Sequence, residues 1–102
     1  MKEITVIQKT LMNPEMINEH GWDVAEYEYR TVASGEVEIN DNAEALEFAY
    51  MASNNIDISW VKNPCWSYVQ NPEGNRSTMV GDMVGIDGVH YECLPFGWRE
   101  IA

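Results

Sequence analysis

The dipeptide Asp87-Gly88 constrains the fold of this chain more than any other feature. Asp-Gly favours a two-residue hairpin turn, because that turn needs positive φ angles that these residues tolerate. Apolar residues alternate with other residues on both sides of the dipeptide. The loop length sets the pairs that should face each other: Ile86 with Val89, Val84 with Tyr91, and Asp82 with Cys93. We therefore predict a hairpin with one apolar face, which Pro95 ends.

A second hairpin is predicted upstream, with strands over residues 24–32 and 36–39. Tyrosine and threonine occupy the later odd positions of the first strand, and charged residues occupy the even positions between them. The segment Ala33-Ser34-Gly35 has the length and the final glycine of a hairpin loop. Such a loop would place Tyr29 opposite Ile39.

Three further elements are expected. Alternating residues predict an N-terminal strand over residues 3–9. A short helix is expected over residues 14–19, with proline in its first turn and glycine just behind it. Apolar spacing predicts the main helix over residues 43–53, capped by Asp41 or Asn42.

The connection over residues 57–78 is longer than an ordinary loop. It contains three aromatic residues, so part of it must pack, and we expect it to hold additional structure or a functional site. Phe96-Gly97-Trp98 is expected to close over the core edge. The whole sequence predicts one α+β domain over residues 1–102. Its small, mostly antiparallel sheet, made of two hairpins and an N-terminal strand, packs against one main helix.

The charge balance gives the strongest functional signal. Seventeen acidic residues face six basic ones, for a formal charge of −11, which disfavours nucleic-acid binding through a basic face. Residues 15–47 carry −9 of that charge. The expected acidic face comprises Glu26, Glu28, Glu36, Glu38, Glu44 and Glu47. Three interpretations are open: solubility, docking onto a basic protein, or occupation of another protein's nucleic-acid channel as a DNA mimic.

Two aromatic residues of the long connection are candidates for exposed binding anchors. Trp66 and Tyr68 lie between its two Asn-Pro steps. Tryptophan and tyrosine are enriched at the anchors of protein interfaces, although they also fill cores.

The sequence shows neither a membrane span nor a signal peptide, and it therefore predicts a cytoplasmic protein that contacts no membrane. No apolar run approaches the length of a membrane span, and the N-terminal residues lack the apolar stretch and cleavage site of a signal peptide. The two cysteines, Cys65 and Cys93, do not form a disulfide framework and are expected to be reduced.

Most catalytic signatures are missing from the sequence, among them GxSxG, GxxxxGK[ST], HExxH and CxxC. The candidate zinc ligands are His20, His90, Cys65 and Cys93. His90 and Cys93 are three residues apart on a predicted strand, so they should point to opposite faces. The Asp41-Asn42-Ala43-Glu44 segment lacks the alternating oxygen ligands of a calcium loop. We expect no metal and no cofactor.

Two weaker chemical hypotheses remain. His90 and Glu92 share one strand face about 7 Å apart, which is the arrangement for acid–base work in a small hydrolase, but a solvated strand face lacks the desolvated cavity that this chemistry needs. Arg76-Ser77-Thr78 offers a guanidinium and two hydroxyls to an anion, although such residues more often tie a loop to a strand.

A family resemblance covers about residues 54–101. It rests on these segments: Asn54-Asn55-Ile56-Asp57-x-Ser59-Trp60, Gly74-Asn75-Arg76-Ser77-Thr78-x-Val80-Gly81-Asp82, Tyr91-x-Cys93 and Gly97-Trp98-x-x-Ile101. Their order resembles small uncharacterised proteins of tailed bacteriophages, in which an Arg-Ser-x-Ser-Val-Gly-Asp-Val segment leads into a hairpin. A similar ending occurs in YodL-like domains. Here Thr78-Met79 stands where Ser-Val is expected.

The resemblance implies a phage gene product that acts in a bacterial host, and it carries over no catalytic residue. We therefore expect a non-enzymatic protein whose acidic face binds, and modulates or inhibits, a basic host or defence protein. The DNA mimic is the sharpest form of this hypothesis. The alternatives are a structural or assembly homo-oligomer and a small hydrolase that uses His90 with Glu92.

Overall fold

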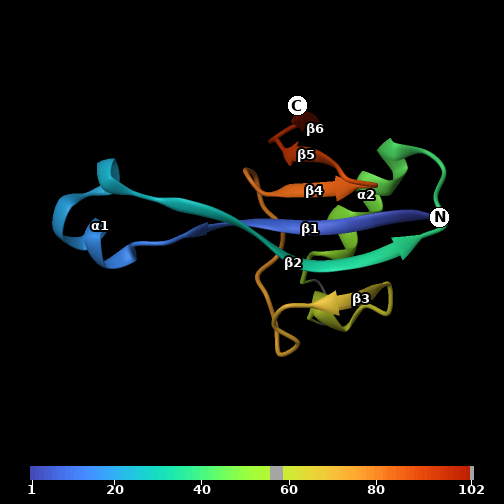
Figure 1. Ribbon diagram of the computed structural model, residues 1–102, viewed down its shortest axis with the longest axis horizontal. Coiled ribbons are helices and arrows are strands. Elements are labelled where there is room, and N and C mark those ends of the chain that lie inside the picture. Colours follow the sequence, from blue (N-terminus) through green and yellow to red (C-terminus); the bar gives the residue numbers. More distant parts are fainter. Residues whose placement is uncertain (56–58, 102) are drawn as a thin grey trace.

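The computed structural model describes residues 1–55 and 59–101. It shows a six-stranded antiparallel sheet in the order β3-β2-β1-β4-β5-β6 (Figure 1). The strands are β1 (Lys2–Leu11), β2 (Tyr27–Val37), β3 (Trp66–Val69), β4 (Met83–Ile86), β5 (Val89–Cys93) and β6 (Trp98–Ile101). The helices are α1 (Pro14–His20) and α2 (Asn42–Ala52), with 3₁₀ turns η1 (Trp22–Val24) and η2 (Trp60–Lys62). The predicted α+β class is confirmed.

The C-terminal hairpin has the predicted register. β4 pairs with β5 through Ile86 opposite Val89 and Val84 opposite Tyr91. The turn residues Asp87 and Gly88 have φ angles of 50° and 86°, as the Asp-Gly signal requires.

The sheet continues beyond the predicted end of this hairpin. Pro95 ends β5, but a turn closed by the bond from Leu94 N to Gly97 O brings β6 back alongside β5. Trp98 packs edge-to-face on Tyr50 with ring centroids 6.1 Å apart, so this part of the expected closure is present. Phe96 is 94% exposed and covers nothing.

The loop predicted at Ala33-Ser34-Gly35 is wrong. β2 runs straight through these residues and pairs with β1 along the full length of both strands. Tyr29 therefore lies opposite Lys9 and not opposite Ile39. Small residues here serve close packing: a Cβ on Gly35 would overlap the carbonyl oxygen of Cys65, which lies just before β3.

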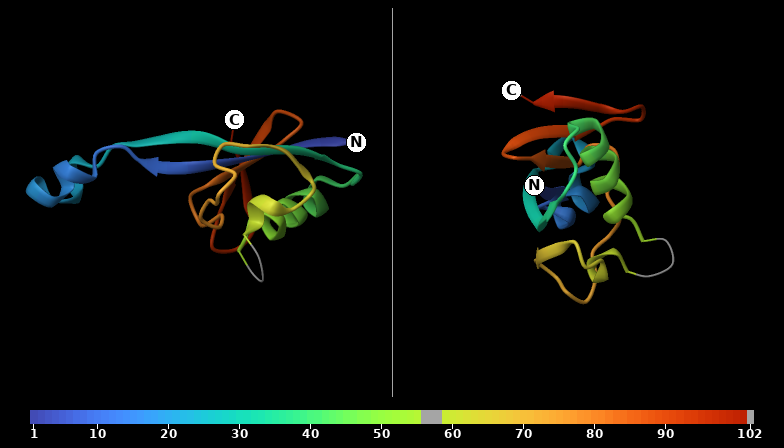
Figure 2. Two further views of the ribbon diagram at one scale, coloured as in Figure 1. Left: turned by 90° about the horizontal axis from the view of Figure 1, so that it is seen from below. Right: turned by 90° about the vertical axis from the view of Figure 1, so that its right-hand side faces the viewer.

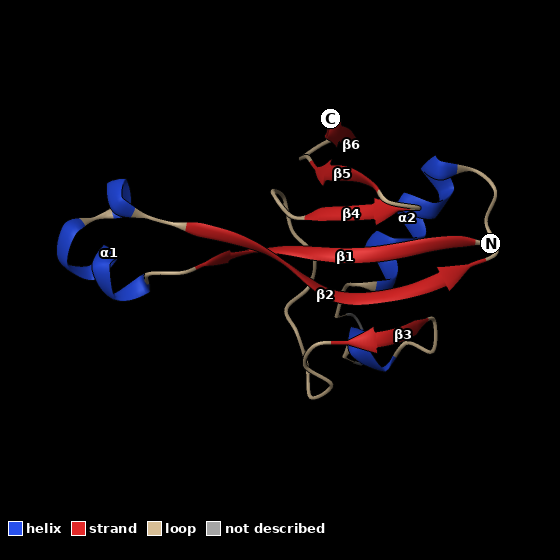
Figure 3. Cartoon of the chain, viewed as in Figure 1, coloured by secondary structure: helices blue, strands red, loops and turns tan. Residues whose placement is uncertain are grey.

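β1 and β2 form one long hairpin whose far end projects from the sheet as an arm, residues 9–29 (Figures 1 and 3). α1, which has the predicted bounds to within one residue, and η1 lie at its tip, and neither contains a buried residue. Asn13 braces the arm, because its side chain donates to Val24 O at 2.7 Å and accepts from Glu26 N at 2.8 Å. The molecule is 47 Å long as a result.

The core lies between the sheet and α2, which covers one face of it (Figure 2). Ile4, Val6 and Val84 of the central strands are fully buried there. Burial of side chains of this kind contributes about 1.5–3 kcal/mol each. The predicted main helix is confirmed, and the Asp41 carboxylate caps it by accepting from Glu44 N at 3.4 Å. Among the described helices, none has the length and apolar composition of a membrane span.

The long connection holds additional structure, as expected. η2 and β3 lie within it, and β3 pairs with β2 as an edge strand.

Substituting Gly35→Ala should lower the free energy of unfolding by roughly 3 kcal/mol, because the new methyl group meets backbone that cannot rotate away. Urea denaturation measures the loss. The neighbouring Ser34→Ala, whose side chain is only half-buried, is the control and should cost less than about 1 kcal/mol. Equal losses in the two variants would contradict the close approach as the reason for this glycine.

Candidate functional site

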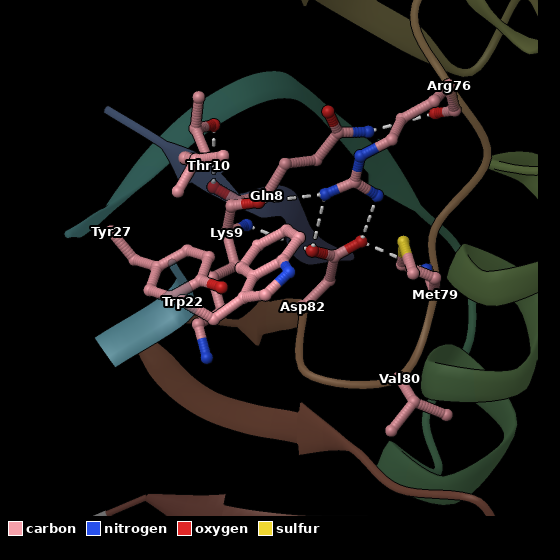
Figure 4. A pocket seen from close by; sticks show the side chains of 10 residues that line it. Gln8, Lys9, Thr10, Trp22, Tyr27, Arg76, Met79, Val80 and Asp82 are labelled. Atoms are coloured by element: carbon pink, nitrogen blue, oxygen red, sulfur yellow. Dashed lines mark hydrogen bonds and ion pairs between the residues drawn. The ribbon is translucent and has the colours of Figure 1, made fainter. Parts of the chain in front are cut away.

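The buried Asp82 forms an ion pair with the partly exposed Arg76 where the arm leaves the sheet (Figure 4). Asp82 is 1% exposed, and Arg76 Nη1 and Nη2 donate to its two oxygens at 2.6 and 2.8 Å. The backbone N–H groups of Lys9 and Met79 donate to the same oxygens at 2.9 Å each. Four donors therefore compensate a carboxylate that is buried away from water.

Arg76 joins segments that are far apart in the sequence. Its guanidinium also donates to Lys9 O at 3.0 Å and to Ser77 O at 3.1 Å. Its own carbonyl accepts from Gln8 Nε2 at 2.9 Å and from Trp60 Nε1 at 2.8 Å. The hydrogen bonds with Asp82 raise the pKa of the Arg76 guanidinium, so the residue stays charged.

Ser77 and Thr78 extend these contacts to the end of α2. Ser77 Oγ accepts from Asn55 N at 2.7 Å, and the Thr78 hydroxyl donates to Ser53 Oγ at 2.7 Å. Because the Thr78 hydroxyl and all the Nη hydrogens of Arg76 donate to acceptors inside the protein, these contacts favour a structural tie over the anion site considered from the sequence. The Arg-Ser-Thr-x-Val-Gly-Asp motif thus pairs its first residue with its last.

The six glutamates of the expected acidic face are exposed, but they do not share one surface. A β-bulge in the β1–β2 ladder between Val6 and Ile7 adds one residue to β2 and reverses its alternation. Glu28 therefore lies opposite Thr10, on one face of the ladder, whereas Glu36 lies opposite Glu3, on the other face. Glu26 lies on the arm, next to Glu28.

Glu44 and Glu47 lie on the solvent side of α2, beside exposed apolar side chains. The two glutamates border a shallow apolar hollow of about 610 Å³, which we call the acid-rimmed hollow. Its other lining residues are Ile39, Ala43, Phe48, Tyr50 and Met51. Glu38 precedes Ile39 in the chain and is also exposed.

The two predicted aromatic anchors differ in their surroundings. Trp66 is 9% exposed and packs edge-to-face on Trp60, with its Nε1 donating to Ala52 O at 3.2 Å, so its assignment as an exposed anchor is wrong. Trp66 lies on the helix side of the sheet, opposite Gly35, where it fills the core. Tyr68 is 48% exposed, as the hypothesis requires.

Sequence reasoning overlooked Trp22, which is 68% exposed near the tip of the arm. The residues around the segment Gly21-Trp22-Asp23 show no apolar pattern. This absence could have indicated that the Trp22 ring is exposed.

The residues considered for acid–base and metal chemistry are not assembled into a centre. Glu92 forms an ion pair with Arg99, and His90 is exposed on the same sheet face. Cys93 is buried, away from His90, as the strand spacing predicts. Across residues 1–55 and 59–101, no group of three or more His, Cys, Asp or Glu side chains is placed to hold a metal ion.

Substituting Asp82→Asn should lower the free energy of unfolding by about 2 kcal/mol, because the buried side chain loses its charge-assisted hydrogen bonds and the new amide NH₂ group faces donors. Thermal and urea denaturation measure this loss. The control Arg99→Gln breaks the exposed pair with Glu92 and should cost less than about 1 kcal/mol. A loss for Asp82→Asn no larger than that of the control would show that this ion pair does not hold the loop that contains Arg76.

The two thiols should make the protein less stable at alkaline pH. Burial raises the pKa of Cys65 to about 11 and also raises the pKa of Cys93. An unfolded thiol ionises near pH 8.5, so above that pH the unfolded chain loses protons that the folded chain keeps, and the free energy of unfolding falls as the pH rises toward 11. Between pH 8 and pH 10 the wild type should lose on the order of 1 kcal/mol more than Cys65→Ala. Urea denaturation at the two pH values measures these losses. Equal losses of unfolding free energy in the two proteins would contradict this prediction.

Comparisons with protein-family models, curated proteins and solved structures found no match to this chain. The expectation of a phage protein therefore rests on the sequence segments that carry the resemblance.

Proposed function

We propose that this protein is a non-enzymatic binding protein that docks onto a basic partner protein through its acid-rimmed hollow. The observation that carries the proposal is the combination of exposed apolar side chains and carboxylates at one place. Met51 is 59% exposed and Tyr50 is 40% exposed, and Glu44 and Glu47 stand beside them. Protein interfaces commonly place an apolar anchor in a hollow inside a polar rim.

The charge of the hollow specifies the partner's chemistry. None of the residues that line it is basic, and the whole chain carries −11. A complementary surface therefore presents an apolar side chain flanked by lysine or arginine. Electrostatic attraction of this kind accelerates association and weakens as the ionic strength rises.

The resemblance to phage proteins supplies the setting of the proposal. The partner is then a basic host or defence protein, and the place of action is the cytoplasm of the bacterial host.

Two observations support docking over the DNA mimic and over the homo-oligomer. A DNA mimic needs its carboxylates arrayed along one surface, whereas the β-bulge separates Glu28 from Glu36 and the arm holds Glu26 and Glu28 apart from α2. A homo-oligomer built on the long connection needs an exposed Trp66, which is buried. Two acid-rimmed hollows would also repel each other.

Charge reversal at the hollow should weaken partner capture. The immobilised protein is exposed to bacterial lysate, and bound proteins are eluted with a salt gradient with and without duplex DNA. We expect the double variant Glu44→Lys with Glu47→Lys to lower the affinity for the captured basic protein at least about tenfold, since both rim charges are inverted. The control, Glu26→Lys with Glu28→Lys, makes the same change in charge on the arm and should keep the partner.

Three outcomes would contradict the docking hypothesis. Equal losses in the two double variants would show a response to net charge alone. A partner that stays bound in 1 M salt would exclude an electrostatic interface, because screening there acts within about 3 Å. A partner released by duplex DNA, and lost in the arm variant, would favour the nucleic-acid mimic.

A further inference from the structure

A second cavity lies alongside the arm, away from the acid-rimmed hollow. It has a volume of about 510 Å³, within the range of small-molecule sites. β1 of the arm, η1, the first residue of β2 and the loop after Arg76 all contribute to its walls. Figure 4 shows the Trp22 and Tyr27 rings on one side of this pocket and the Arg76–Asp82 pair on the other.

The apolar walls of the pocket are largely open to solvent. Trp22 is 68% exposed, Tyr27 is 47% exposed, and Met79 and Val80 are 55% and 54% exposed. All four line the one pocket, although they come from three segments of the chain. An exposed aromatic ring can stack against a planar ligand, and such stacking contributes on the order of 1–3 kcal/mol per nucleic-acid base.

The pocket is positive within an acidic protein. The charged residues that line it are Lys9, Arg76 and Asp82, two positive and one negative, whereas the chain as a whole carries −11. The buried Asp82 is neutralised by Arg76, whose Nη hydrogens all have partners inside the protein. Lys9 is exposed, and among the described residues none forms a salt bridge with it, so its ammonium can contact a ligand.

Lys9 also stands beside the aromatic wall. Its Nζ lies 4.4 Å from the centroid of the Tyr27 ring. A ligand that stacks on the rings can therefore place an anionic group near this ammonium, where a charge-assisted hydrogen bond contributes about 1.5–3 kcal/mol.

We propose that this pocket binds a small aromatic anion of mononucleotide size. The ring stacks on Trp22 or Tyr27, and the anionic group contacts Lys9. A nucleic-acid strand is a poorer ligand, because its successive phosphates would be repelled by a protein whose net charge is −11. This inference does not depend on the proposed docking function, since the pocket and the acid-rimmed hollow share no residue.

The test is a titration of the ¹⁵N-labelled full chain with adenosine monophosphate, followed by NMR. We expect saturable shifts of the Trp22 indole signal and of the backbone amides of residues 9–11 and 79–80. Adenosine and inorganic phosphate, which each lack one half of the recognised chemistry, should bind at least about tenfold more weakly. An oligo-deoxyadenylate should also bind more weakly than the monophosphate.

Substitutions test the contact with the anionic group and the stacking contact separately. Lys9→Gln should weaken binding of adenosine monophosphate about tenfold, whereas Lys62→Gln, which removes an exposed charge on η2, should leave it unchanged. Trp22→Ala should weaken binding without unfolding the chain, because the ring is 68% exposed. No shifts at 10 mM adenosine monophosphate, equal binding of adenosine, or unchanged binding by Lys9→Gln in a folded variant would overturn the proposal.

Discussion

The ion pair that the buried Asp82 forms with Arg76 is the interaction on which the rest of the structure depends. A carboxylate at 1% exposure is stable only if its charge and its lone pairs are satisfied. Here a guanidinium and two backbone N–H groups satisfy them, and these donors belong to β1, to the loop and to the residues just before β4. The requirement to compensate one buried charge therefore holds the start of the arm, the entry to the C-terminal hairpin and the long connection together. The same contacts give a physical reason for the spacing between arginine and aspartate in the motif that resembles phage proteins.

The second constraint is the β-bulge in the β1–β2 ladder, because it decides which side chains act together. Without it, every second residue of β2 would keep one face, and Glu28 and Glu36 would lie on the same surface. With it, Glu28 and Glu36 lie on opposite faces of the ladder. The charge of −11 is therefore distributed over separate regions of the molecule. The region at α2 combines this charge with an apolar hollow, whereas the charged residues that line the pocket along the arm have a net positive charge.

The elements that could be predicted are those specified by local interactions. The hairpin around Asp87-Gly88, the short helix after Asn13 and the helix capped by Asp41 each depend on turn, proline or capping preferences within a few residues. The predicted loop at Ala33-Ser34-Gly35 was wrong because the same small residues suit a loop and a tightly packed strand. The choice was made by Cys65, thirty residues away, whose carbonyl needs the space at Gly35. Trp66 was misjudged for the same reason, since its partners, Trp60 and Ala52, become its neighbours only after folding.

The sequence by itself determined the α+β class, the helix positions, the register of the C-terminal hairpin and the acidic charge, because each follows from composition or from contacts between near neighbours. Only the tertiary structure decided which residues form surfaces. It brought Trp22 and Tyr27 of the arm together with Met79 and Val80 in one pocket. It also placed Glu44 and Glu47 around an apolar hollow. The ion pair with Asp82 gave Arg76 a structural role. The physical reason is that pairing between distant strands, and the bulge that shifts it, set the face of each side chain, and no local pattern encodes that pairing.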